Sequence, residues 1–91
     1  MFQPDQIKER ILKSLPGADV DVRDMTGTGN HFEARIVSST FSNQPMIQQH
    51  QSVYASVDDW LKSGELHALA LRTFTPEQWT RFLTPKPQGG P

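Results

Sequence analysis

The 91-residue sequence contains no cysteine. This absence excludes a disulfide framework, a cysteine-ligated zinc site, a thiol nucleophile and an iron–sulfur cluster held by protein ligands of this chain alone. No apolar run approaches the roughly 20 residues that a membrane helix needs. The first residues also lack the charged and then apolar layout of a secretory signal. We therefore expect a small soluble domain in the cytoplasm, with no membrane contact.

An excess of charge of one sign is lacking too. Nine Lys and Arg residues stand against ten Asp and Glu residues, and the formal net charge is −1. The whole-chain basic character that usually accompanies nucleic-acid binding is therefore missing. The catalytic motifs GxSxG and HExxH are absent, and the carboxylates are scattered along the chain. These absences predict a protein that is not an enzyme.

The pattern of residues 5–37 predicts a helix followed by two strands. Apolar residues at helical spacing predict an amphipathic helix over residues 5–15, which Pro16 and Gly17 end. Strict alternation of apolar and polar residues predicts strands at 18–23 and 31–37. The Gly-rich loop between these strands favours an antiparallel hairpin.

The remaining sequence predicts two helices, a third strand and a final helix. A helix is predicted after Pro45, because a set of residues recurs at helical spacing: Met46, Ile47, His50, Val53, Tyr54 and Val57. A short helix follows Ser56. Residues 66–73 are apolar on both alternations and predict a well-buried strand. Thr75 caps the last helix, whose expected buried edge is Trp79, Phe82 and Leu83.

The element order α-β-β-α-α-β-α predicts an α+β fold with one domain. The hairpin is antiparallel, and the long helical connection allows the third strand to pair in parallel in a three-stranded mixed sheet. With helices covering one face, this is a two-layer sandwich. The expected domain spans residues 1–83. The tail at 84–91 has three prolines and two glycines and is predicted to be disordered.

The loop containing Gly27 and Gly29 could suggest a phosphate-binding loop. Such a loop needs the pattern GxxxxGK[ST] between a strand and a helix. This loop joins two strands and carries no lysine. Because glycine tolerates left-handed backbone, a turn is the better interpretation.

Three histidines are the remaining candidates for chemistry. His31 opens the second strand on its polar face, where a solvated side chain is the simplest interpretation. His50 lies in the middle of a helix and suits a half-buried packing role. His67 stands at the start of an otherwise apolar strand. It is either an exposed strand end or a functional site, because a histidine can titrate, donate a hydrogen bond or bind a metal.

Five segments, taken in order, resemble one known family. They are residues 24–32 (DMTGTGNHF), 37–41, 50–54 (HQSVY), 66–71 (LHALAL) and 75–79 (TPEQW). Together they are similar to the BolA family, over most of the chain from about Ile7 to Trp79. The resemblance implies the fold of that family, which is related to type II KH domains. This matches the element order predicted above.

The resemblance implies a partner and a cofactor. BolA-like proteins pair with monothiol glutaredoxins of the CGFS type, and the pair bridges a 2Fe–2S cluster with glutathione. His67 matches the family's C-terminal histidine ligand. The second family ligand lies in the hairpin loop, where Thr28 stands at a position that carries cysteine in some members. His31 is the candidate second ligand; Asn30, a water or no second ligand are the alternatives. The implied partner interface is Thr28, Asn30, His67 and Ala68.

Two other interpretations stay open. The family also includes transcription regulators, which would use the KH-like or helix-turn-helix region to bind DNA. Residues 45–57 contain no charged residue, so any DNA binding is expected to be weak and salt-sensitive. Alternatively, the chain binds its glutaredoxin without a cluster, and His67 only donates or accepts a hydrogen bond. Without a partner, we expect a monomer or weak homodimer that holds no cofactor.

Overall fold

The computed structural model describes residues 3–27, 29 and 31–83. The elements are α1 (Pro4–Ser14), β1 (Asp19–Asp24), β2 (His31–Val37), the 3-10 helix η1 (Ser39–Phe41), α2 (Met46–Ser56), α3 (Asp58–Ser63), β3 (Ala68–Phe74) and α4 (Pro76–Leu83). The predicted order and the α+β fold class are confirmed, with η1 as the one addition. The tail predicted to be disordered, 84–91, lies outside the described residues. None of the helices in the described ranges has the length and apolar character needed to cross a membrane.

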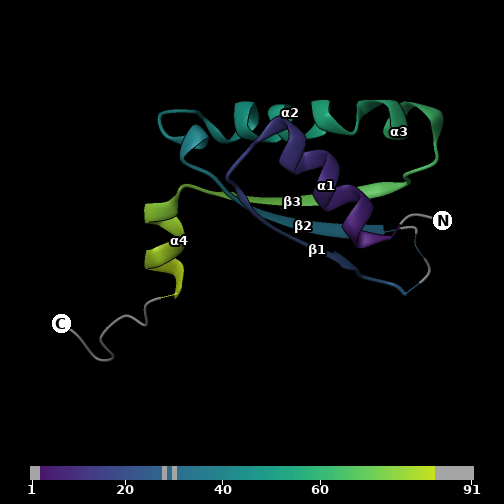
Figure 1. Cartoon of the computed structure of the whole chain (residues 1–91), viewed down its shortest axis with the longest axis horizontal. Coiled ribbons are helices and arrows are strands. Elements are labelled where there is room, and N and C mark those ends of the chain that lie inside the picture. Colours follow the sequence, from purple (N-terminus) through teal and green to yellow (C-terminus); the bar gives the residue numbers. More distant parts are fainter. Residues whose placement is uncertain (1–2, 28, 30, 84–91) are drawn as a thin grey trace.

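The three strands form one mixed sheet in the order β1-β2-β3. β1 and β2 pair antiparallel, and β2 and β3 pair in parallel, as predicted. A parallel neighbour requires a long crossover, and η1, α2 and α3 provide it. Figure 1 shows α1, α2 and α3 together on one side of the sheet. This arrangement makes β2 the central strand and gives both β1 and β3 an open edge.

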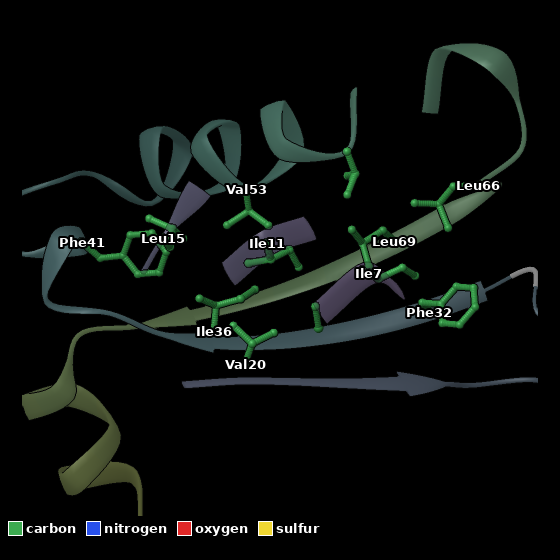
Figure 2. Close-up of a cluster of buried hydrophobic side chains, with 12 residues drawn as sticks. Ile7, Ile11, Leu15, Val20, Phe32, Ile36, Phe41, Val53, Leu66 and Leu69 are labelled. Atoms are coloured by element: carbon green, nitrogen blue, oxygen red, sulfur yellow. The ribbon is translucent and has the colours of Figure 1, made fainter. Parts of the chain in front are cut away.

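The core lies between the sheet and these three helices. Phe32, Ala34 and Ile36 of β2 are all at most 2% exposed, and Figure 2 shows Phe32 and Ile36 pointing into the same cluster as Ile7 and Ile11 of α1. Burial of alternate residues confirms the predicted faces of β2, because successive side chains of a strand point to opposite sides. The other face of β2 carries the side chains of Glu33 and Arg35.

Val53 and Val57 at the end of α2 lie in the core, as predicted, but the first turn of the helix differs from the prediction. Met46 and Ile47 are 65% and 67% exposed, whereas Gln49 is buried. The Gln49 amide explains the difference, because both of its ends have partners. Its Nε2 donates to the Gln44 carbonyl oxygen at 2.8 Å, and its Oε1 accepts from the Thr73 hydroxyl at 2.7 Å. A satisfied amide can be buried at modest cost, and this one ties α2 to β3.

β3 is less buried than the sequence predicted. Ala70 and Arg72 are exposed, and Leu66 and His67 precede the strand instead of forming its first residues. The reason is that the face of the sheet opposite α1, α2 and α3 carries only the short helix α4, which leaves Ala70 and Arg72 exposed. Continuous apolar runs indicate burial on both faces only when both faces are covered. Leu66 still enters the core, at 1% exposure.

α4 lies on the opposite side of the sheet from the other helices (Figure 1). Thr75 and Gln78 form the predicted reciprocal cap: the Thr75 N–H donates to Gln78 Oε1 and the Gln78 N–H to Thr75 Oγ1. The expected buried edge is wrong, because none of the residues of α4 is buried, and Phe82 and Leu83 are 57% and 60% exposed. The prediction that helices cover one face holds for three of the four α-helices.

Contacts between aromatic rings and guanidinium groups hold α4 against the sheet. The Trp79 ring stacks on Phe82 with centroids 5.3 Å apart, and lies 5.1 Å from the Phe74 ring. The Arg35 guanidinium lies 4.5 Å from the Trp79 ring centroid, and Arg72 lies 5.3 Å from that of Phe82. Each such contact contributes about 0.5–1.5 kcal/mol. The attachment of α4 is therefore local and modest.

Replacing Trp79 with alanine is expected to release α4 without unfolding the domain. The three lost contacts amount to about 1.5–4.5 kcal/mol, so amide hydrogen exchange in α4 should accelerate more than about tenfold. Amides of β2 serve as the internal control, since the core does not include α4. Equal acceleration in β2 and α4, or no acceleration in α4, would contradict this account of how α4 is held.

Candidate functional site

The sheet brings three of the predicted site residues to one end. Because β2 and β3 run in parallel, their first residues meet at the same edge, and His31 is the Cα partner of Ala68. His67 is the residue directly before Ala68. Figure 1 shows the hairpin between β1 and β2 and the connection from α3 to β3 at this same end of the sheet. His31, His67 and Ala68, distant in sequence, are therefore neighbours in the fold.

His67 is an exposed side chain on an anchored backbone. Before it, Leu66 is buried, and its N–H donates to the Trp60 carbonyl oxygen at 3.1 Å. After it, Leu69 is buried, and its carbonyl oxygen accepts from the Tyr54 hydroxyl at 2.9 Å. These contacts fix the chain on both sides of an imidazole that faces solvent. A ligand on a rigid support needs little ordering when it binds.

His31 has a similar support. Its carbonyl oxygen accepts from the Met25 N–H at 2.8 Å, which closes the base of the hairpin. The next residue, Phe32, is 2% exposed and anchors the strand in the core. The His31 side chain is exposed, as predicted for the polar face, and Ala68 beside it is half-buried. Both histidines are thus available to a partner that approaches this end.

Asp24, which the sequence analysis did not single out, holds the backbone at this end of the sheet. The Asp24 carboxylate accepts three backbone N–H groups of the hairpin loop: Thr26 at 3.3 Å and Gly27 at 3.0 Å on Oδ1, and Gly29 at 2.8 Å on Oδ2. Gly27 and Gly29 have φ angles of 73° and 77°, as the turn interpretation requires. An Asp followed by Gly-rich sequence is a known signal for such side-chain to backbone bonds.

The same bonds explain why this loop is not a phosphate cradle. A Gly-rich loop binds an anion through backbone N–H groups that point into one concavity. Here the N–H groups of Gly27 and Gly29 already donate to Asp24. These N–H groups therefore bind the carboxylate of Asp24 in place of a phosphate.

The other candidates stand apart from this end or outside the described residues. Thr28 and Asn30 lie outside the described residues. His50 is half-buried on α2, which fits the predicted packing role. Across 3–27, 29 and 31–83, no group of three or more His, Asp and Glu side chains is arranged to hold a metal ion. The donors that fit iron at the hairpin end are imidazole nitrogens, which bind it in place of thiolates in some 2Fe–2S centres. Since the chain has no cysteine, thiolate ligands would have to come from another molecule.

Comparison with known proteins places the chain in a family. The solved structure of a BolA protein homologue from Coxiella burnetii is 32% identical, has a TM-score of 0.76, and is matched over 89% of this chain and 100% of that one. BolA-like protein 2 of Mus musculus is 33% identical over 79 residues, which cover 85% of this chain and 90% of that protein. The DNA-binding transcriptional regulator BolA of Haemophilus influenzae is 43% identical over 53 residues, which cover 58% of this chain and 50% of that protein. The family model described as BolA-like protein matches residues 13–78. The chain belongs to the BolA-like family.

Proposed function

We propose that this protein is a non-enzymatic adaptor in iron–sulfur and redox homeostasis, which binds a monothiol glutaredoxin and co-ligates a bridging 2Fe–2S cluster. The observation that carries the proposal is the exposed His67, held on an anchored backbone beside the hairpin loop. Membership of the BolA-like family supports it. The cytoplasmic location and the monomeric or weakly dimeric state without a partner stay predictions.

His67 would supply one imidazole nitrogen to iron, and His31 is the candidate for a second. The glutaredoxin cysteine and glutathione would supply the thiolates that this sequence lacks. A cluster with imidazole in place of thiolate has a raised reduction potential. The rigid backbone around His67 keeps the imidazole at the surface, and the sheet register keeps His31 at the same end. The chain therefore contributes donors and a docking surface, with no catalytic step.

A reconstitution experiment tests the proposal. A CGFS-type glutaredoxin is mixed with glutathione, ferrous iron and sulfide, with and without this protein, and visible circular dichroism and complex mass are recorded. We expect a new spectrum and a one-to-one heterodimer when both proteins are present. A spectrum identical to that of the glutaredoxin alone would contradict cluster sharing. The same mixture without iron separates a shared cluster from binding that needs none.

DNA binding is the second candidate, because one relative is named a DNA-binding transcriptional regulator. The charges of the described residues do not favour it. Within the part of the chain that the structure describes, five Lys and Arg side chains form ion pairs with carboxylates: Arg10, Arg23, Arg35, Lys62 and Arg81. α2 contains no Lys or Arg, and phosphate contacts by these residues supply most non-specific affinity. Titration against duplex DNA at low and physiological salt decides between the two functions.

A further inference from the structure

The shape of the loop between β1 and β2 depends on one side chain. The Asp24 carboxylate accepts the N–H groups of Thr26, Gly27 and Gly29 at 3.3, 3.0 and 2.8 Å. Hydrogen bonds to an ionised acceptor are stronger than neutral ones. Gly29 is buried within this arrangement. The N–H groups of Thr26, Gly27 and Gly29 thus converge on a charge at the last position of β1.

The sheet itself does not need these bonds. β1 and β2 pair in register from Asp19 with Val37 to Asp24 with Phe32, and the bond from the Met25 N–H to the His31 carbonyl oxygen closes the hairpin. Phe32 is anchored in the core independently. Removing the Asp24 carboxylate would leave the hairpin paired and free only the loop that it encloses. The carboxylate therefore determines the conformation of the loop, not the existence of the strand pair.

We propose that Asp24 is a positioning residue for the partner: it holds the backbone of Thr26, Gly27 and Gly29 in the conformation that the glutaredoxin contacts, and so sets the affinity of the complex. This inference rests on the proposed function. The loop leads directly into His31 and lies at the sheet end that carries His67. A loop that is ordered before binding does not lose that conformational entropy on binding. A loop without its carboxylate must be ordered by the partner.

The test compares three variants with the wild type. Asp24→Ala removes the acceptor of the Thr26, Gly27 and Gly29 N–H groups, and Asp24→Asn keeps one carbonyl oxygen. Asp19→Ala is the matched control, because it removes the same charge from the other end of β1 and breaks only the exposed ion pair to Arg35. Backbone nitrogen order parameters of Gly27 and Gly29 report the loop in the isolated protein. Calorimetry with an iron-free CGFS-type glutaredoxin reports the dissociation constant.

For Asp24→Ala we expect lower order parameters at both glycines and about tenfold weaker binding, equivalent to about 1.4 kcal/mol. Asp24→Asn should lie between this variant and the wild type, and Asp19→Ala should match the wild type in both measurements. A disordered loop with unchanged affinity overturns the inference, as does a loop that stays ordered. If Asp24→Ala does not fold, Asp24→Asn against Asp19→Ala decides the question by the same two measurements.

Different results would contradict glutaredoxin binding itself and the positioning role of Asp24. If the wild type does not bind the glutaredoxin at all, with or without iron, the proposed function is wrong and the positioning role falls with it. If the wild type binds and the Asp24 variants bind equally well, only the positioning role is wrong. A mere effect on folding would lower the melting temperature without the graded order of the three affinities.

Discussion

Changing His67 to alanine is expected to abolish the shared cluster while leaving the iron-free complex intact. The side chain is exposed and fills no part of the core, so the domain should keep its fold and its melting temperature. An outer-sphere partner of a metal ligand already contributes about 10- to 100-fold in affinity, and the loss of a ligand should reach at least that range. Visible circular dichroism of the reconstituted mixture, normalised to bound iron, measures the effect.

His50→Ala is the matched control, because His50 lies half-buried on α2, away from the hairpin end. It should leave the cluster spectrum unchanged. His31→Ala tests the second ligand separately: a changed spectrum assigns His31 to the cluster, and an unchanged one leaves that position to another donor. If His67→Ala forms the same cluster with the same yield as the wild type, the assignment of His67 is wrong.

The sequence predicted the elements of the fold because local signals decide them. Alternation of polar and apolar residues identified β1 and β2, and the reciprocal cap of Thr75 and Gln78 identified the start of α4. It failed where tertiary contacts decide. Gln49 of α2 is buried because it accepts a hydrogen bond from Thr73, which lies 24 residues away in the sequence. No periodicity in α2 alone contains that information.

α4 illustrates a second limit. An apolar stripe on a helix predicts burial, and Trp79, Phe82 and Leu83 form such a stripe. The stripe faces the open side of the sheet, where Arg35 and Arg72 meet it with guanidinium groups instead of an apolar layer. Whether an aromatic residue is buried among apolar residues or packs against cations depends on which face of the sheet the chain crosses. That choice follows from the geometry after Phe74, which composition does not reveal.

The sequence offered candidate donors for the site, whose roles stay predictions, but not the contacts that support them. His67 was predicted from its match to a family ligand and His31 as the nitrogen donor near the hairpin loop, and the parallel register of β2 and β3 explains why they share one end. Asp24 was missed because its role needs three backbone N–H groups to converge on one carboxylate. Residue types predict that an aspartate can bond to a nearby turn. Only the folded loop specifies which N–H groups it receives.

Phe32 connects the stability of the domain to the position of this site, and Phe32→Ala is expected to have the largest effect on folding. Phe32 is 2% exposed and is the Cα partner of Asp24 in β1 and of Leu69 in β3. Figure 2 shows its ring at the same end of the core as Leu66, the residue before His67. A buried Phe replaced by alanine costs about 3–5 kcal/mol, out of a typical total of about 5–15 kcal/mol. The melting temperature should fall by more than about 12 °C.

Phe82→Ala provides the matched control, since it removes the same side chain from a position that is 57% exposed. Because α4 lies outside the core, losing the ring contacts of Phe82 should loosen this helix and leave the melting temperature of the domain nearly unchanged. Thermal unfolding followed by far-ultraviolet circular dichroism separates the two variants, and equal shifts would contradict the core position of Phe32. Below its melting temperature, Phe32→Ala should also bind the glutaredoxin more weakly than Phe82→Ala. The substitution leaves a cavity next to His31 and near Leu66, the residue before His67. Packing that is lost there disturbs the site and the core together.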